Sequence, residues 1–314
     1  LNGLLYERNV DVYVTGSNAR FLSKDVVTTF RGRGDEVRVH PLSFAEYLSV
    51  QQPLPFAEQH LNEYMRLGGL PQLVVMNSEQ QKRQYLSQLF ANTYLVDIKE
   101  RYAIRNDDDL EELIDVIASS IGTLTNPTKI ANSFASVKQS QLSKDTIKRY
   151  LDYMQDAFMI EKAVRYDIKG RKYIDTPAKY YFEDLGLRNA RINFRQTEPT
   201  HLMENLIYNE LRVKGYSIDV GQVVTNTRNA NGVSERKQLE VDFVCNKADE
   251  RIYIQSAYAM PTPEKQEQEL KSLKLINDNF QKVVIAGGMQ PTYRNNDGIL
   301  ILNIYDFLLN KVTI

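Results

Sequence analysis

The chain has 314 residues, which favours two or three domains, each long enough to bury a core of its own. Hydrophobic residues make up 42% of the chain and charged residues 25%, as in ordinary soluble globular proteins. The net charge of −1 excludes long-range attraction of nucleic acid by the chain as a whole, so contact with DNA would require a local basic patch.

Signals for a compartment favour the cytoplasm. The longest apolar runs, such as residues 283–286 and 300–302, are far shorter than the roughly 20 residues of a membrane-spanning helix. The opening Leu1-Asn2-Gly3 lacks the charged start and the long apolar stretch of a signal peptide. Cys245 is the single cysteine, which excludes an intrachain disulfide and fits a reducing environment. We therefore expect a cytoplasmic protein without membrane contact.

Two short strands are predicted near the start of the chain. Residues 10–15 alternate β-branched and aromatic side chains, and residues 37–42 also favour a strand. Ser43 is then expected to be the N-cap of a helix, because Glu46 three residues later completes a capping box.

Three motifs in this region belong together. They are Thr15-Gly16-Ser17-Asn18, the arginines of Arg31-Gly32-Arg33-Gly34, and Pro41-Leu42-Ser43-Phe44-Ala45-Glu46-Tyr47. Their combination resembles a family of bacterial and archaeal AAA-type ATPases. The resemblance implies that Ser17 and Asn18 sense the γ-phosphate or its attacking water, and that Arg31 or Arg33 contacts nucleotide charge. The plainer alternative is that Ser17 and Asn18 merely end a strand.

The phosphate-binding loop of such an ATPase does not occur in this chain. That loop is Gly-x4-Gly-Lys-Ser/Thr, whose backbone amides and lysine hold the phosphates. Gly68-Gly69 and Gly287-Gly288 lack the lysine that would follow, and no strand before Val10 ends in paired acids for Mg²⁺. We therefore expect a piece of a longer protein. By itself it would use neither ATP nor Mg²⁺, although the intact family uses both.

Two amphipathic helices are predicted over residues 56–76 and 79–99, from the helical spacing of their apolar residues. Gly68-Gly69-Leu70-Pro71 interrupts the first helix, and the AAA-type family has a similar break there. By resemblance, this region corresponds to the helical lid that follows the ATPase core. Residues 180–188 contain Asp-x-Gly-Leu and also resemble the family, in which this segment leads into the C-terminal domain.

A winged helix-turn-helix is predicted in the middle of the chain. Helices are expected at residues 107–122, at 126–131 and after Ser143, which is a plausible N-cap. Strands are expected at 159–166 and 178–182. The order of three helices and a hairpin is that of a winged helix.

The exposed face of this unit carries candidates for contact with DNA phosphates. They are Lys144, Lys148 and Arg149 on the recognition helix, and Lys169, Arg171 and Lys172 in the wing. Acidic Asp145, Asp152 and Asp156 share the recognition helix and dilute the patch. The alternative is therefore a solvated helix face and a module that docks onto protein.

The C-terminal part has an αβββαβ order. The predicted elements are a helix at 201–214, strands at 217–224, 238–245 and 251–257, a helix at 263–276 and a strand at 282–286. This order resembles the core of the restriction-endonuclease-like fold. The resemblance implies that Glu204 is the helix glutamate, that Asp242 is the strand acid, and that Gln255 and Ala257 fall on the Glu-x-Lys pair.

Two of these positions lack the groups that metal-dependent phosphodiester cleavage needs. Gln255 is a neutral amide, and Ala257 cannot carry the charge of the lysine. Only Glu240 could replace the carboxylate, with Lys265 or Lys271 in place of the lysine. We therefore expect Glu204, Glu240 and Asp242 to form a buried polar cluster satisfied by amides and tyrosine hydroxyls.

No metal site is predicted, because His40, His60 and His201 lie far apart and lack metal-ligand spacing. The sequence thus predicts an α/β protein with a mainly helical middle. The expected domains are an AAA-type remnant at 1–50, a lid-like region at 51–105, a winged-helix-like domain at 106–190 and a restriction-endonuclease-like domain at 191–314.

The leading functional hypothesis is a non-catalytic portion of an AAA-type ATPase that binds DNA or protein. The rival hypothesis is a Mg²⁺-dependent nuclease, and a third is a purely structural interaction module. Without a catalytic set, the chain is not expected to be an enzyme by itself, and no small-molecule substrate is indicated.

Overall fold

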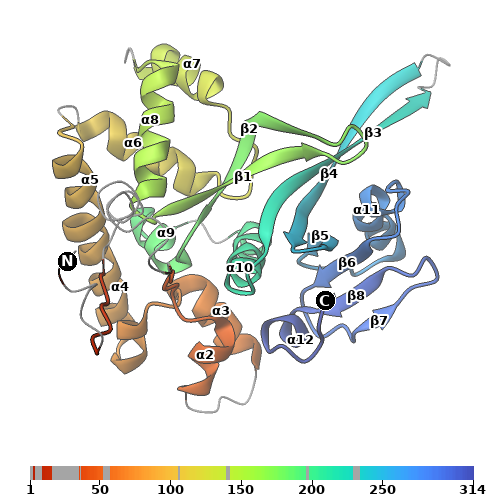
Figure 1. Ribbon diagram of the computed structural model, residues 1–314, viewed down its shortest axis with the longest axis horizontal. Coiled ribbons are helices and arrows are strands. Elements are labelled where there is room, and N and C mark those ends of the chain that lie inside the picture. Colours follow the sequence, from red (N-terminus) through yellow and green to blue (C-terminus); the bar gives the residue numbers. More distant parts are fainter. Residues whose placement is uncertain are drawn as a thin grey trace.

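A computed structural model describes residues 3, 9–15, 35, 37–51, 57–104, 107–138, 142–195, 198–228 and 234–314. The predicted nucleotide-sensing residues Ser17, Asn18, Arg31 and Arg33 lie outside these ranges. The prediction of an α/β protein is confirmed at the level of a large mixed sheet together with helices (Figure 1).

Helices dominate the first part of the described chain. They are α2 (Phe44–Ser49), α3 (Ala57–Leu67), the 3-10 turn η3 (Pro71–Val75), α4 (Glu79–Leu89), the π-helical η4 (Phe90–Leu95), α5 (Val96–Arg101), α6 (Asp107–Ser119), α7 (Pro127–Lys138) and α8 (Lys144–Asp156). The two predicted N-caps are confirmed: Ser43 and Glu46 form a complete capping box, and the Ser143 side chain accepts a hydrogen bond from the amide of Thr146.

Strands dominate the second part. The elements are β1 (Ile160–Asp167), β2 (Lys172–Phe182), α9 (Leu185–Arg191), α10 (Pro199–Val213), β3 (Ser217–Arg228), β4 (Ser234–Lys247), β5 (Glu250–Ala257), α11 (Pro263–Lys274), β6 (Gln281–Ala286), β7 (Tyr293–Arg294), β8 (Leu300–Asn303) and α12 (Ile304–Leu308). Each strand and helix of the predicted αβββαβ series is therefore present in the predicted order.

One eight-stranded sheet joins the central hairpin to the C-terminal part. Its strand order is β2-β1-β3-β4-β5-β6-β8-β7. The junction is a short parallel pairing between β1 and β3, in which Arg165–Asp167 lie beside Val220–Gln222. The boundary predicted at residue 190 falls inside α9, and strands from both sides of it share this sheet.

The two faces of the sheet are covered by different helices. On one face α10 contributes Leu206 and Leu211 to a core that contains Phe243 and Ile254. On the other face Leu273 of α11 packs in a second cluster with the sheet residues Val241, Val244 and Tyr253. The switch between Val241 and Phe243 follows from a bulge, because β4 has one residue more than β3 between two paired positions. Asp242 and Phe243 consequently both face α10.

Helix α9 is the centre of the helical part, where it packs on α3, α4 and α6. Its Arg188 is 1% exposed and donates from Nε to the carbonyl of Ala118 at 2.6 Å. Asn189 donates to the carbonyls of Met65 and Arg66 at the end of α3. These bonds satisfy helix-end carbonyls that have no partner within their own helix.

The predicted strands at 10–15 and 37–42 are not formed among the described residues of those segments. Their apolar side chains face outward: Tyr13 and Val39 are each 89% exposed, and Val37 is 82% exposed. A strand requires a neighbour for its backbone hydrogen bonds, and no described strand pairs with these segments.

Candidate functional site

Three motifs identified in the sequence converge on Asp184, the second residue after β2. Its carboxylate caps α9 by accepting the amide of Leu187 at 2.9 Å. The same carboxylate accepts the amide of Gly69, in the break after α3, at 2.8 Å. The carbonyl of Gly69 in turn accepts the amide of Leu42, which belongs to the segment that leads into α2. One buried carboxylate thus ties the segment that leads into α2 to the helices and the hairpin.

Glycine is required at this junction because backbones approach closely. A Cβ atom at Gly69 would lie 2.3 Å from the carbonyl oxygen of Leu42. A Cβ atom at Gly186 would lie 1.9 Å from the carbonyl oxygen of Leu67. Burial raises the pKa of Asp184 to about 6, and the amide hydrogen bonds oppose that rise.

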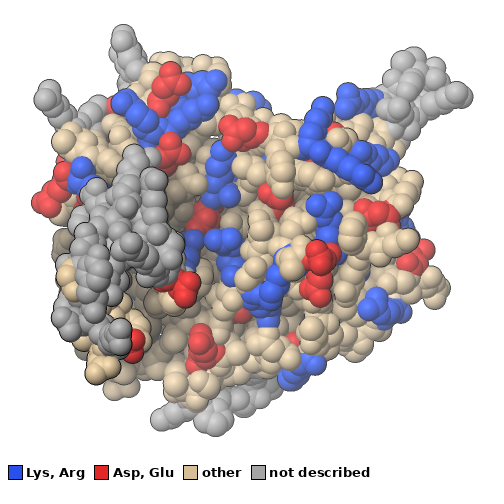
Figure 2. Space-filling model, in the orientation of Figure 1, with Lys and Arg blue, Asp and Glu red and all other residues tan. Residues whose placement is uncertain are grey.

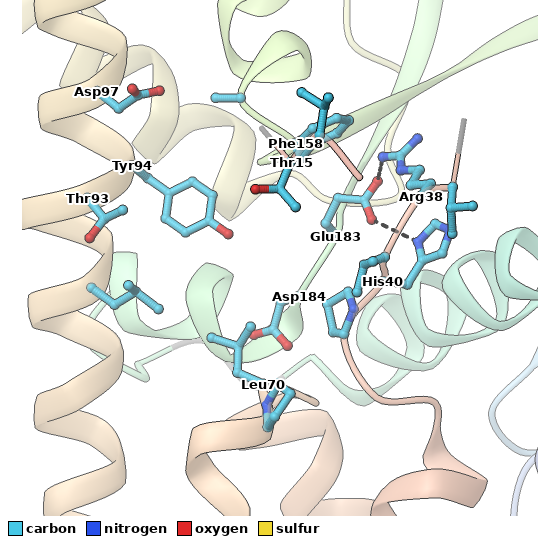
Figure 3. Close-up of a pocket in the computed structure, with 17 residues that line it drawn as sticks. Thr15, Arg38, His40, Leu70, Thr93, Tyr94, Asp97, Phe158, Glu183 and Asp184 are labelled. Carbon is cyan, nitrogen blue, oxygen red and sulfur yellow. Dashed lines mark hydrogen bonds and ion pairs between the residues drawn. The ribbon is translucent and has the colours of Figure 1, made fainter. Parts of the chain in front are cut away.

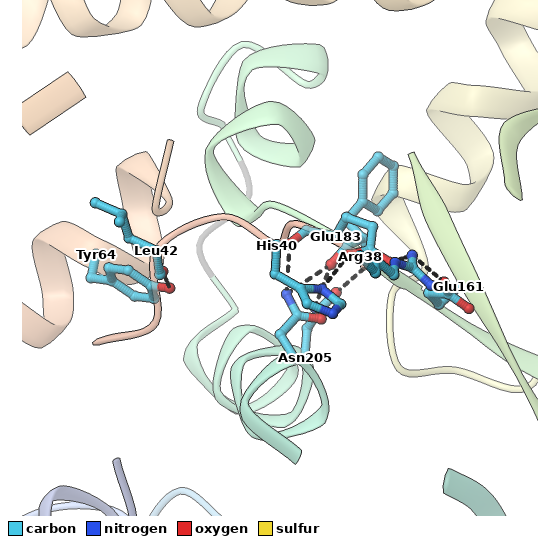
Figure 4. A network of polar contacts seen from close by, with 9 residues as sticks. Arg38, His40, Leu42, Tyr64, Glu161, Glu183 and Asn205 are labelled. Carbon is cyan, nitrogen blue, oxygen red and sulfur yellow. Dashed lines mark hydrogen bonds and ion pairs between the residues drawn. The ribbon is translucent and has the colours of Figure 1, made fainter. Parts of the chain in front are cut away.

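A charged network lies beside this junction (Figure 4). Arg38 bridges Glu161 of β1 and Glu183 at the end of β2. His40 Nδ1 lies 3.5 Å from the Glu183 carboxylate. Burial alone would raise the pKa of Glu183, but the hydrogen bond with His40 and the charge on Arg38 outweigh it and lower the pKa. Residues 38–40 are therefore held against the hairpin by charge, without being part of the sheet.

A cavity of about 550 Å³ opens between the same segments (Figure 3). Its walls come from residues 14–15 and 37–41, from the start of η3, from α4 to α5, and from residues 157–158 and 183–184. Tyr94 extends from η4 toward Thr15 and Glu183. Burial raises the pKa of Tyr94 to about 12, helped by the nearby Asp184. The phenol is therefore a neutral hydrogen-bonding group at physiological pH.

A second polar cluster lies on the α10 face of the sheet, where Lys179 of β2 brings together Glu204 and Asp242, two of the predicted nuclease positions. Its Nζ lies 2.8 Å from Glu204, 2.6 Å from Glu240 and 3.8 Å from Asp242. Tyr181 donates its hydroxyl to Glu204 at 2.7 Å, and the amide of Ser256 donates to Asp242 at 2.8 Å. The polar cluster is thus satisfied by an amide and a tyrosine hydroxyl, and also by a lysine that the sequence analysis did not place there.

The cluster perturbs its own protonation states. Burial raises the pKa of Asp242 well above its ordinary value, and the neighbouring Glu204 charge raises it further. Burial alone would lower the pKa of Lys179, but the three carboxylates outweigh it and raise the pKa. Lys179 is therefore a permanent cation that offsets part of the buried negative charge.

The other two predicted nuclease positions do not join this cluster. Gln255 accepts a weak hydrogen bond of 3.4 Å from Ser272 of α11, and Ala257 packs in the core on the α11 face. The strand alternates, so that Ile254 and Ser256 face α10 and the acidic residues. Gln255 and Ala257 are therefore separated from Glu204 and Asp242 by the thickness of the sheet.

Lys179 could have been found from one signal in the sequence. It stands in the run Ala178-Lys179-Tyr180-Tyr181-Phe182, whose other members are buried. A lysine inside such a run is almost never fully buried unless it is paired with acids. The identity of those acids depends on contacts between distant segments, which local sequence patterns do not specify.

The predicted DNA-binding residues are all exposed but form two separate groups. Lys144, Lys148 and Arg149 lie on α8, and Lys169, Arg171 and Lys172 lie at the turn between β1 and β2. Figure 1 shows α8 among the helices and the hairpin turn beside β3. In Figure 2, blue side chains gather over the end of the sheet where this turn meets β3 and β4.

Two negative findings apply to the described residues only. No group of three or more His, Cys, Asp or Glu side chains is arranged there to hold a metal ion. Within the same ranges, every helix is too short or too polar to cross a membrane.

Comparison with known proteins adds family relationships. Residues 1–48 match the family described as AAA domain, and residues 58–198 match a Domain of unknown function (DUF8612). An uncharacterized protein of Haemophilus influenzae is 35% identical over 98% of this chain and 73% of its own length. An uncharacterized protein of Methanocaldococcus jannaschii is 27% identical over 88% of this chain and 63% of its own length.

The first relationship is close enough to define membership: the chain belongs to the same family as the Haemophilus influenzae protein. The similarity of this chain to an AAA domain lies at residues 1–48. A crystal structure of a Vibrio cholerae protein is similar at 13% identity, covering 89% of this chain and 63% of that chain, with a TM-score of 0.26. A score that low carries no argument about fold or function.

Proposed function

We propose that this chain is a non-catalytic part of an AAA-type ATPase that binds a macromolecular partner. The observation that carries the proposal is the match of residues 1–48 to an AAA domain. The phosphate-binding loop of such an ATPase is not among the 314 residues, so nucleotide would be held by a part that longer family members supply.

The exposed segments near the start support this reading. Tyr13, Val37 and Val39 present large apolar side chains to solvent, although soluble proteins usually bury contiguous apolar surface. Strand-forming residues that pair with no described strand suit a sheet that another part of the ATPase completes. Arg38 and His40 would then connect that sheet to the hairpin through Glu161 and Glu183.

The partner-binding part has features that favour two finer assignments. The order α6, α7, α8, β1, β2 suits a winged helix, and an isolated bridge between Thr125 and Ala178 ties the segment before α7 to β2. The series α10, β3, β4, β5, α11, β6 suits a restriction-endonuclease-like core. Both assignments are proposals that rest on element order.

Nucleotide titration tests the proposal on this chain. Isothermal calorimetry with ATP and Mg²⁺ is expected to give no saturable binding, because no run of backbone amides and lysine is present to hold the phosphates. A parallel titration with ADP and Mg²⁺ provides the matched nucleotide for comparison with ATP. Saturable ATP binding by these 314 residues would contradict the assignment of a non-catalytic part.

A second candidate is a metal-dependent nuclease, which one observation favours. Lys179 brings a cation to Glu204 and Asp242, which the predicted Glu-x-Lys positions could not supply. Carboxylates suit Mg²⁺, but here the ammonium group already lies between all three of them. The arrangement therefore does not fit a bound metal unless Lys179 withdraws, and we rank this function second.

Plasmid cleavage distinguishes the two candidates. Purified protein is incubated with supercoiled DNA and Mg²⁺ or Mn²⁺, alongside the Asp242→Ala variant. No nicking by either protein is expected. Nicking by the wild type that the variant lacks would establish the nuclease instead.

A further inference from the structure

A basic strip crosses the end of the sheet from the β1–β2 turn over β3 to β4. Its residues are Lys169, Arg171, Lys172, Arg236 and Lys237, and all of them are exposed. The pairing of strands brings the two parts together. Ile168 donates its amide to Gln222 of β3, and three residues farther along β3 Thr225 pairs with Lys237 of β4.

Four of these five cations are weakly compensated by acids. Within the described part of the chain, Lys169, Arg171, Lys172 and Arg236 form no ion pair. The nearest acid along the turn is Asp167, which is 8% exposed and accepts the amide of Gly170 at 2.9 Å. Its carboxylate is therefore occupied inside the turn, and the cations stay directed to solvent.

Helix α8 differs in this respect. Lys148 lines a small polar pocket together with Asp152, Lys162 and Asp175. Lys162 is already ion-paired with Asp175. Asp145 is exposed at the start of the same helix, so the basic residues of α8 stand among acids. A polyanion would meet less net positive charge there than at the end of the sheet.

The shape of the region also suits a nucleic acid. Strand β4 pairs with β5 only from Phe243 to Lys247, so the stretch that carries Arg236 and Lys237 is a two-stranded ribbon with β3. Figure 1 shows this ribbon extending beyond the other strands. Two-stranded ribbons fit the major groove of DNA, while basic side chains at their margins contact the phosphates.

We propose that the turn between β1 and β2 and the ribbon of β3 and β4 together bind the phosphate backbone of duplex DNA. The proposal rests on the proposed function and names DNA as its partner. Binding is independent of sequence and is strongly weakened by salt, since each neutralised phosphate releases counterions. If Lys169, Arg171, Lys172 and Arg236 each contact a phosphate, the logarithmic salt slope is roughly −3 to −4.

Fluorescence anisotropy with a short labelled duplex tests the proposal between about 50 and 200 mM salt. The double variant Lys169→Glu/Arg236→Glu takes one residue from each part of the strip. It is expected to weaken binding at least tenfold and to reduce the salt slope by about 2. Lys129→Glu/Arg195→Glu makes the same charge change at exposed sites elsewhere and should change affinity less than threefold, about 0.7 kcal/mol.

Further arms make each outcome decisive. The α8 variant Lys144→Glu/Arg149→Glu should lose less affinity than the strip variant, and a larger loss would overturn the proposal. So would absence of binding by the wild type at low salt, or tighter binding of single-stranded RNA. Circular dichroism verifies folding, and Lys169→Gln/Arg236→Gln repeats the test with a smaller charge change. These results are independent of nucleotide titration, so either proposal can fail alone.

Discussion

The buried Lys179 provides the sharpest test of how the α10 face of the sheet is packed. Lys179 is 2% exposed, and its ammonium contacts Glu204 and Glu240 within 2.8 Å. Replacing it with methionine keeps most of the side-chain volume but removes the charge. Glu204 and Asp242 would then be left as buried acids without a cation, which is the situation in which breaking a buried pair is most destabilising.

The structure allows the magnitude to be estimated. Loss of one partner of a buried ion pair lowers the free energy of unfolding by about 3–5 kcal/mol. Glu240 is the partner with the most exposed side chain, at 36%. Glu240→Gln should therefore lower that free energy by only about 1 kcal/mol or less.

Urea unfolding followed by circular dichroism measures these differences. The double variant Lys179→Met/Glu204→Gln should recover part of the loss, because one of the uncompensated acids is also removed. The loss in Lys179→Met should also shrink at low pH, because burial raises the pKa of Asp242 and its carboxyl group is then neutral without the lysine. A loss of unfolding free energy below about 1 kcal/mol in Lys179→Met would refute the reasoning, because breaking a truly buried ion pair is strongly destabilising.

Two further predictions concern the junction at Asp184. The pKa of Asp184 is about 6 in the folded state and near 3.8 in the unfolded state, so the folded state binds this proton more tightly. The contribution of this proton to the free energy of unfolding is full below pH 3.8 and is lost as the pH rises through 6. Relative to the wild type, Asp184→Asn should therefore gain up to about 3 kcal/mol of stability between pH 4 and 7, measured by urea unfolding at both pH values. The same difference in unfolding free energy between variant and wild type at both pH values would count against the burial of this carboxylate. Gly69→Ala should lower the free energy of unfolding by about 1–3 kcal/mol, because the added methyl group meets the Leu42 carbonyl oxygen; an unchanged urea midpoint would show that the two backbones are not in close contact.

Local signals predicted much of the fold. Ser43 and Ser143 are N-caps because their side chains satisfy helix amides within three residues, a relation that the sequence displays directly. The C-terminal series of helix and strands also follows from short-range periodicity. The same kind of signal could not place β1 beside β3, since the paired Arg165 and Val220 lie 55 positions apart in the sequence.

The candidate site was less predictable for three physical reasons. Lys179 meets its acids through tertiary contacts between β2, α10 and β4. Gln255 and Ala257 have the spacing of the Glu-x-Lys pair, but strand alternation places them on the α11 side of the sheet. Residues 10–15 and 37–42 have strand-like patterns, but a strand forms only where another strand is present to pair with it.

The relationship to AAA-type ATPases is tested most directly on the Haemophilus influenzae relative, of which this chain spans 73%. ATP hydrolysis is measured for the whole relative and for the segment that aligns with these 314 residues, with Mg²⁺ present in both. From the proposal of a non-catalytic part, we expect phosphate release by the whole protein and none by the segment. Equal hydrolysis by both, or none by the whole protein with or without DNA, would contradict it.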